Sequence, residues 1–186
     1  MLITSAAGGP GSLLVQAALN ARAFVIGAAG GPDKVEQVRR LGASVAVDYD
    51  QDGWASSVQA ALSDGSSDGR EVSIVLDAIG GERGRAALEL LGMDGRFLVH
   101  GFSSGEPTPL SGSDLLERGI TASAAIGGRL IRRPGGLRSL EGAALAALAT
   151  GQLVPLLTRF PLAEAAVAHA ALENRETVGK VVLIPA

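Results

Sequence analysis

The organising stretch of this sequence is Met1-Leu-Ile-Thr-Ser-Ala-Ala-Gly-Gly-Pro-Gly-Ser-Leu-Leu-Val-Gln16. A short apolar run leads into a Gly-rich turn, and apolar residues at helical spacing follow the turn. This order predicts a strand, a tight turn and a helix. We expect the apolar face of the helix to contain Leu13, Leu14, Ala17, Ala18 and Ala21.

The turn carries the spacing Ala6-x-Gly8-x-x-Gly11, which is the pattern G-x-G-x-x-G with alanine in its first position. In this pattern the middle glycine lets the backbone approach a pyrophosphate, and the last lets the helix pack close to the strand. Pro10 suits the first helical turn, where its missing N–H costs little. Free N–H groups at the helix start would hold phosphates. A Gly-rich turn that binds nothing is the alternative interpretation.

Composition excludes several classes of protein. The 186 residues are 47% hydrophobic, which is enough for one good-sized core. A net charge of −3, without a basic cluster and with one Trp and one Tyr, argues against nucleic-acid binding. The absence of cysteine excludes disulfides and thiolate ligands, and His100 and His169 lie too far apart to suggest a metal site. No apolar run reaches the ~18 residues of a membrane span and no signal peptide is apparent, so we expect a cytoplasmic protein.

Strand and helix patterns alternate along residues 1–126, which predicts an α/β fold with a parallel, doubly wound sheet of order 3-2-1-4-5-6 and helices on both faces. The expected strands after the first are 23–27, 44–48, 72–77, 97–101 and 120–126, with a turn at 92–95. The expected helices between them are 32–41, 54–62, 83–91 and 114–117. A further helix is expected at 137–150. The pattern then changes to an extended segment at 154–160, a helix at 162–173 and a strand at 179–185. We therefore expect a nucleotide-binding domain over 1–153 and a separate C-terminal segment over 154–186.

The end of the second strand bears on the choice of cofactor. It has no Asp or Glu to hold a ribose 2′-hydroxyl, and Lys34 follows at the next helix start. This favours NADP over NAD, although Lys34 would also suit a solvated helix surface. The missing acid argues against a methyltransferase that uses S-adenosylmethionine, and the lack of G-K-[ST] argues against a P-loop NTPase. Tyr49 has Gly53 four residues on, so the Tyr-x-x-x-Lys pair of short-chain dehydrogenases is absent.

One motif suggests a different class of enzyme. Gly101-Phe-Ser-Ser-Gly105 matches the nucleophile elbow of serine hydrolases, and Asp114 and His169 follow in the order of the triad. An elbow runs directly into a helix, which Glu106-Pro-Thr-Pro109 forbids. We interpret the motif as a polar loop at the ligand edge of the sheet.

A series of motifs resembles a known family. The sequence is similar over its whole length to the zinc-independent medium-chain dehydrogenase/reductases, above all the quinone oxidoreductase (zeta-crystallin-like) group. The resemblance implies a homodimeric NADPH-dependent reductase of quinones, enones or related carbonyl compounds. The motifs that carry it are Ala6-Ala-Gly-Gly-Pro-Gly-Ser12, Val25-Ile-Gly-Ala-Ala-Gly-Gly-Pro-Asp-Lys34, Leu41-Gly-Ala43, Val47-Asp-Tyr49, Val75-Leu-Asp-Ala-Ile-Gly-Gly81, Gly95-Arg-Phe-Leu-Val-His-Gly101 and Val178-Gly-Lys-Val-Val-Leu183.

The resemblance also implies the residues of the cofactor site, whereas it identifies no catalytic residue and no metal ligand. Lys34 corresponds to the position that binds the 2′-phosphate, Tyr49 lies near the same end, and Arg175 is expected to reach the cofactor from just before the last strand. The remaining residues divide among the pyrophosphate turn (Ala6, Gly8, Gly9, Pro10 and Gly11), the ribose turn (Asp77, Ala78 and Ile79) and the nicotinamide-ribose loop (Gly101, Phe102 and Ser103). Pro10 stands where the family usually has valine.

In this family a GroES-like domain precedes the first strand and forms the other wall of the active site. Because Met1 stands directly on that strand, the resemblance implies a nucleotide-binding half that is weakly active or inactive alone. It also implies a homodimer through the edge strand Ile120–Ile126, as exposed edge strands pair readily. The alternative is a non-catalytic nucleotide-binding or scaffold module.

Overall fold

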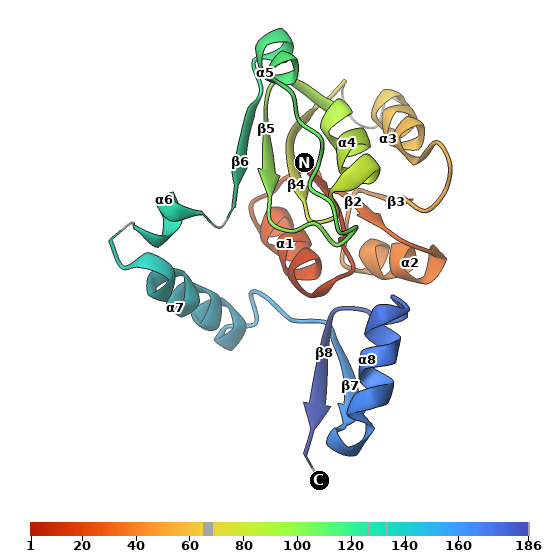
Figure 1. Cartoon of the computed structure of the whole chain (residues 1–186), viewed down its shortest axis with the longest axis vertical. Helices are drawn as coiled ribbons and strands as arrows, with labels where there is room; N and C mark the ends of the chain where they lie inside the picture. Colours follow the sequence, from red (N-terminus) through yellow and green to blue (C-terminus); the bar gives the residue numbers. More distant parts are fainter. Residues whose placement is uncertain (65–68, 126, 133, 186) are drawn as a thin grey trace.

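A computed structural model describes residues 1–64, 69–125, 127–132 and 134–185. Six parallel strands form a sheet of order β3-β2-β1-β4-β5-β6, which confirms the order predicted from the sequence. Helices lie on both faces of this sheet, and a separate pair of parallel strands, β7 and β8, lies beyond its carboxyl edge (Figure 1). The strands are β1 Leu2–Ile3, β2 Ile26–Ala29, β3 Val45–Asp48, β4 Val72–Asp77, β5 Leu91–Val99, β6 Thr121–Ala124, β7 Leu157–Pro161 and β8 Lys180–Ile184. The helices are α1 Gly9–Asn20, α2 Pro32–Arg40, α3 Trp54–Ser63, α4 Gly81–Glu89, α5 Gly112–Arg118, α6 Gly128–Ile131, α7 Gly136–Ala149, the 3₁₀ turn η1 Leu162–Glu164, and α8 Ala165–Glu173.

The first strand is short but central. Leu2 pairs with Ile26 of β2 on one side and with Val75 of β4 on the other. Successive strand residues point to opposite faces, so Leu2 joins the apolar cluster under α3 and α4, whereas Ile3 joins the cluster under α1 and α2. Both side chains are fully buried. The sheet is therefore built outward from β1, with a core on each face.

The buried face of α1 differs from the prediction. Gly11, Ser12, Val15 and Ala18 are buried, whereas two residues of the predicted face, Ala17 and Ala21, are exposed. The helix packs closely against the preceding turn at Gly11, so the buried face includes Gly11 and Ser12 as well as apolar side chains. The C-terminal end of α1 shortens the second strand. The N–H of Ala23 donates to the carbonyl of Ala18, so β2 begins at Ile26.

A turn predicted at 92–95 belongs instead to β5. Val72 pairs with Leu91 and Ile74 with Arg96, so five steps along β5 match two steps along β4. The extra residues bulge out of the ladder, with Asp94 in the left-handed conformation at φ 54°. The predicted edge strand 120–126 is reduced to Thr121–Ala124, and its last residue, Ile126, lies outside the described residues.

The C-terminal segment forms a small β-α-β unit that contacts the sheet through α1 and the Gly-rich turn. The Gln16 side chain exchanges two hydrogen bonds of 2.8 Å with the backbone of Val154. The N–H of Gly179 donates to the carbonyl of Ala7 at 2.7 Å, beside a bridge between Gly8 and Gly179. These contacts bring residues more than 130 positions apart to the carboxyl end of β1.

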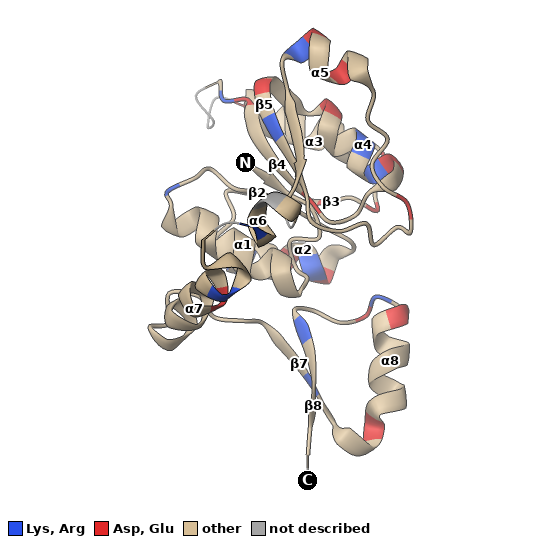
Figure 2. Ribbon diagram, turned by 60° about the vertical axis from the view of Figure 1, so that its left-hand side comes forward, with Lys and Arg blue, Asp and Glu red and all other residues tan. Residues whose placement is uncertain are grey.

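The helix α7 stands apart from both sheets in two views (Figures 1 and 2). Its charged residues lie near its first turns, and none of its described residues is buried. Within the described ranges, no helix has the length and apolar character needed to span a membrane.

Candidate functional site

A cleft of about 210 Å³ lies where the carboxyl ends of β1, β2 and β3 meet the C-terminal segment. In an open α/β sheet this edge is the usual place for a ligand. None of the residues that line the cleft is acidic, and two are cationic. They are Ser5, Ala7, Gly8, Ala29, Gly30, Lys34, Tyr49, Ser103, Leu172, Arg175, Thr177 and Gly179.

The Gly-rich turn forms the floor of the cleft. The N–H of Gly8 donates to the carbonyl of Ser5 at 2.9 Å, and α1 begins at the next residue. A Cβ at Gly11 would lie 2.1 Å from the carbonyl oxygen of Ser5, so only glycine allows this contact. The N–H of Gly11 is in the first helical turn, which lacks intrahelical acceptors, and Gly8 supplies no side-chain cap, whereas the N–H of Gly9 lies at the bridge to Gly179. The N–H of Gly11 can therefore donate to an anion.

The end of β2 forms one side of the cleft. After Ala29 the chain turns through Gly30 and Gly31, and the N–H of Gly31 donates to Oδ1 of Asp48 at 2.9 Å. Burial raises the pKa of the Asp48 carboxyl group, but hydrogen bonds from the backbone of Gly31 and Asp50 outweigh burial, and the net pKa is lowered. Asp48 stays ionised and fixes the turn, whereas the residues at the end of β2 itself, Ala29, Gly30 and Gly31, carry no charge.

Two cations cross the cleft from opposite sides. The Lys34 ammonium group donates to the carbonyl oxygen of Arg175, and the Arg175 guanidinium group donates to the carbonyl oxygen of Ser103 at 3.3 Å. Burial lowers the pKa of Lys34, and the positive charge of Arg175 lowers it further, against the opposing effect of Asp50. An anionic group of a ligand placed between Lys34 and Arg175 would offset the repulsion between their two positive charges.

Tyr49 forms the wall between β3 and α4. Burial raises the pKa of its phenol group, so the hydroxyl stays protonated near neutral pH. The guanidinium group of Arg83 lies 5.4 Å from the centre of the Tyr49 ring and pairs with Asp50 at 2.6 Å. The ring is therefore held in place from the outside, while its other side lines the cleft.

The structure brings part of the predicted cofactor site together. Five predicted residues line the cleft, namely Gly8, Lys34, Tyr49, Ser103 and Arg175. The others do not line it. Gly9, Pro10 and Gly11 form the first turn of α1 above the buried Ala6, and Asp77, Ala78 and Ile79 form the turn after β4. Gly101 and Phe102 lie in the loop after β5, and the Phe102 side chain is largely exposed.

Several lining residues were missed by sequence reasoning. Ser5, Ala7, Ala29 and Gly30 belong to the two motifs already singled out, so their position next to the glycines was a usable signal. The C-terminal residues Leu172, Thr177 and Gly179 reach the cleft only through the fold of a distant segment. The loop 101–110 contains no helix, so the serine-hydrolase elbow lacks the structure that it requires.

These features define the class of the protein, which is a Rossmann-type nucleotide-binding domain. A family model described as zinc-binding dehydrogenase matches residues 41–183, and the chain belongs to that family. A zinc site does not fit the residues present. The sequence has no cysteine, and the described residues include no group of three or more His, Asp or Glu side chains that could hold a metal ion.

The relatives that the chain matches include quinone oxidoreductases and a 2-haloacrylate reductase. The chain is 29% identical to 2-haloacrylate reductase of a Burkholderia species, covering 100% of this chain and 55% of that protein. It is 30% identical to quinone oxidoreductase-like protein 2 of Bos taurus, covering 98% and 52%. The Escherichia coli quinone oxidoreductase, solved with NADPH, matches with a TM-score of 0.82 and 25% identity over 99% of this chain and 56% of that chain. The chain thus spans about half the length of these relatives and corresponds to their nucleotide-binding half.

Proposed function

We propose that the cleft binds NADP(H) and that this chain is the cofactor-binding part of a reductase for quinones, enones or related carbonyl compounds. The observation that carries the proposal is the combination of an uncapped Gly-rich helix start with Lys34 and Arg175 in a cleft free of acidic residues. A dinucleotide with a 2′-phosphate matches this pattern, because each of its phosphate groups then meets a hydrogen-bond donor or a cation. The NADPH complex of the E. coli relative supports the choice of ligand.

The proposed roles of the residues follow from their places. The N–H of Gly11 at the start of α1 holds the pyrophosphate, Lys34 holds the 2′-phosphate, and Tyr49 packs beside the adenosine. Ser103 and its loop hold the nicotinamide ribose. Bound NADPH supplies a hydride for the reduction, and this chain contributes orientation, because hydride transfer depends on the alignment of the two reactants.

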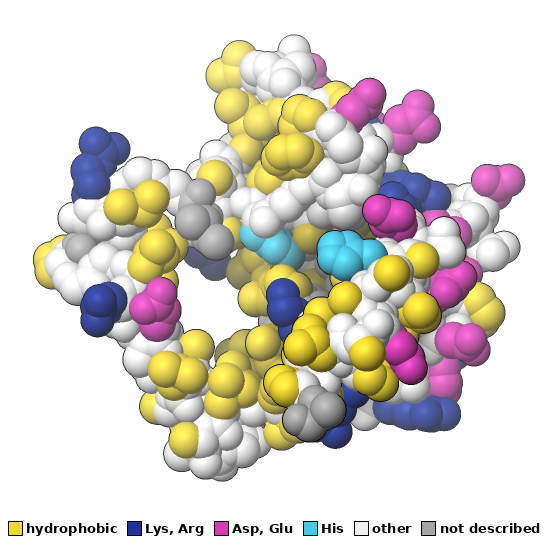
Figure 3. All heavy atoms as spheres, turned by 60° about the horizontal axis from the view of Figure 1, so that its bottom comes forward, with side chains coloured by type: hydrophobic (Ala, Val, Ile, Leu, Met, Phe, Trp, Pro, Cys, Tyr) yellow, Lys and Arg dark blue, Asp and Glu magenta, His cyan; other side chains and the backbone are white. Residues whose placement is uncertain are grey.

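We propose that residues 1–153 form the nucleotide-binding domain and that residues 154–186 pack against the part of the relatives that this chain does not cover. The C-terminal segment exposes large hydrophobic side chains, among them Val154, Leu162 and Val167. Hydrophobic side chains gather on the end of the molecule turned forward in Figure 3. An apolar surface of this kind is typical of a contact face. Turnover of a quinone by the chain alone should therefore be weak or absent.

We also propose a homodimer through β6. Thr121, Ser123 and Ala124 are exposed, and β6 is the terminal strand of the sheet, paired only with β5 in the described residues. An open edge can pair with a second copy. Light scattering at micromolar concentration should give the mass of two chains, and the mass of one chain would contradict this proposal.

The central experiment is a calorimetric titration with NADPH and, separately, with NADH. NADPH should bind more tightly, and Lys34→Ala should weaken NADPH binding by roughly 10- to 150-fold, the value of a hydrogen bond between charged groups. NADH binding should change little, because NADH lacks the 2′-phosphate. The control is Arg39→Ala, which removes an exposed cation from the same helix. Failure of the chain to bind either nucleotide would refute the proposed function.

A further inference from the structure

Asp77, at the end of β4, is a buried carboxylate outside the cleft lining. Its side chain is fully buried, and four hydrogen-bond donors within the protein point at its two oxygens. The Thr4 hydroxyl and the Ile79 N–H donate to Oδ1 at 2.9 and 3.0 Å. The Gly80 N–H and the Thr108 hydroxyl donate to Oδ2 at 3.1 and 2.6 Å. The carboxylate is thus satisfied within the protein and does not reach a ligand in the cleft.

The four donors come from three separate segments at the carboxyl edge of the sheet. Thr4 follows β1, Ile79 and Gly80 form the turn after β4, and Thr108 belongs to the long loop after β5. The bond from Thr108 has the short length of a charge-assisted O–H···O⁻ bond, which makes it one of the stronger hydrogen bonds in a protein. Asp77 therefore ties the loop after β5 to the centre of the sheet.

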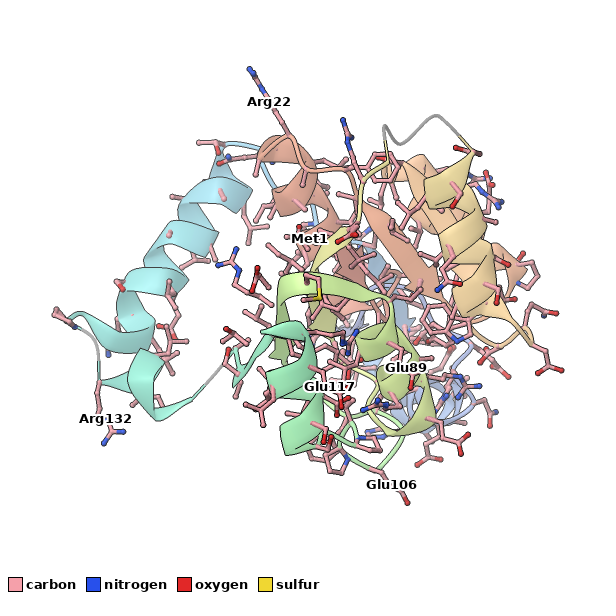
Figure 4. All side chains as sticks on the ribbon, turned by 90° about the horizontal axis from the view of Figure 1, so that it is seen from above. Met1, Arg22, Glu89, Glu106, Glu117 and Arg132 are labelled. Atoms are coloured by element: carbon pink, nitrogen blue, oxygen red, sulfur yellow. The ribbon has the colours of Figure 1, made fainter. Side chains whose placement is uncertain are left out.

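Thr108 is partly buried, and its hydroxyl group bonds to the buried Asp77. Across residues 102–111, all fully described, every other residue is exposed. A Cβ added at Gly84 would lie 2.3 Å from the Thr108 hydroxyl oxygen and 2.8 Å from Oδ2 of Asp77, so the glycine leaves room for this bond. The Glu106 side chain points away from the body of the protein (Figure 4). The backbone of Glu106 forms the contacts instead: its carbonyl accepts from the N–H of Gly81 at 3.0 Å, and its N–H donates to the Ser104 hydroxyl at 3.3 Å.

The same loop supplies one wall of the cleft. The N–H groups of Ser103 and Ser104 donate to the carbonyls of Ala78 and Ile79, both at 2.9 Å. Ser103 lines the cleft, and its carbonyl accepts the bond from Arg175. The backbone holds the loop near Ser103 and at Glu106, and the Arg85 side chain donates to the carbonyl of Pro109 at 3.4 Å. The Thr108 hydroxyl adds the bond from the loop to the buried Asp77.

We propose that Asp77 and Thr108 are positioning residues that fix the loop 101–109 for the nicotinamide half of the cofactor. This inference rests on the proposed function of the cleft. It assigns Asp77 to the support of the loop rather than to contact with a ribose. Loss of the Thr108 hydroxyl then affects the nicotinamide end more than the 2′-phosphate end at Lys34 and Tyr49, because those residues belong to other segments and Lys34 is linked to the loop through Arg175.

The test compares two ligands that share the 2′-phosphate end, NADPH and adenosine 2′,5′-bisphosphate, by calorimetry. Thr108→Val keeps the shape of the side chain but removes the donor, and should weaken NADPH binding by about tenfold, the lower end of the value of one hydrogen bond to a charged group. Binding of the bisphosphate should stay within about twofold, well under the tenfold that corresponds to 1.4 kcal/mol. Thr108→Ser retains a hydroxyl and should restore NADPH binding. Thr150→Val, the same change at the end of α7, should alter neither ligand.

Hydrogen exchange gives a second readout that needs no ligand. In Thr108→Val the amides of Ser103 and Ser104 should exchange faster than in the wild type, whereas the amide of Thr4 in the core should not. Two outcomes would overturn the proposal. One is an equal loss of affinity for NADPH and for the bisphosphate, and the other is unchanged NADPH affinity together with unchanged exchange of the Ser103 and Ser104 amides. If Thr108→Val does not fold, Thr108→Ser carries the test. The proposal is refuted if Thr108→Ser loses NADPH binding while the amides of Ser103 and Ser104 exchange as slowly as in the wild type. Wild-type chain that binds neither ligand would instead overturn the proposed function, and this inference with it.

Discussion

The contact between β2 and α2 can be tested by a double-mutant cycle at Gly27 and Val38. Gly27 is buried in the middle of β2, and a Cβ built there would lie 2.3 Å from Cγ1 of Val38 and 3.2 Å from the Cβ of Ala6. Val38 is fully buried on α2, so its methyl group cannot turn out to solvent. Gly27→Ala should therefore lower the free energy of unfolding by about 1–3 kcal/mol, the usual cost of an overpacked core.

Val38→Ala removes the methyl group that the new side chain would meet. Alone, it should cost about 2–3 kcal/mol, from the transfer of two methyl-sized groups and the cavity left behind. In the double variant the added methyl group fills part of that cavity. The two changes should then cost less than the sum of the single changes by about 1–3 kcal/mol. Urea denaturation followed by circular dichroism measures each free energy of unfolding.

Gly142→Ala is the matched control for this cycle. Gly142 lies in α7 with no heavy atom within 4 Å of an added Cβ, so the substitution should stabilise the chain by about 0.5–1 kcal/mol through helix propensity. If the costs of Gly27→Ala and Val38→Ala are additive, the steric contact between β2 and α2 is not the cause, and the reasoning is refuted.

Two further predictions concern pH. Burial lowers the pKa of His100, against an opposing effect of Asp77, so the unfolded chain binds this proton more readily and stability should fall as pH drops below about 6.5. His100→Gln should flatten that slope in thermal denaturation. The Arg85 side chain, with Ser111, lowers the pKa of Asp114, so its contribution is present above about pH 4 and is lost as pH falls. Asp114→Asn should lower the melting temperature at pH 7, and its difference from wild type should shrink toward pH 3; a constant difference would contradict this assignment.

The parts of the fold that could be predicted are those specified by local sequence. The strand Val72–Asp77 has the predicted bounds because a nearly continuous apolar run is flanked by polar residues and glycine. The strand order followed from alternating strands and helices together with the glycine motif. The predicted buried face of α1 was wrong because the helix packs against the preceding turn through the backbone at Gly11, a contact that no side-chain pattern reports.

The candidate site was predictable as separate pieces but not as an arrangement. Gly8, Lys34 and Tyr49 each stand out next to a strand end, and parallel strands bring such ends to one edge. The bond from Lys34 to Arg175 joins residues 141 positions apart, and nothing in the local sequence specifies that pairing. The supporting role of Thr108 was equally hidden, because a threonine between two prolines predicts a loop and gives no indication of its partner.

The bridge between Gly8 and Gly179 has a consequence for biosynthesis. The last strand of the large sheet ends at Ala124, 55 residues before Gly179, so the nascent chain can begin to form that sheet while the cleft still lacks one side. At a translation rate of about 5–20 residues per second, the interval is about 3–11 s. During this time the Gly-rich turn and Lys34 are accessible without the C-terminal wall. Cofactor present in the cell can therefore meet the half-built cleft before the segment around Arg175 arrives to complete it.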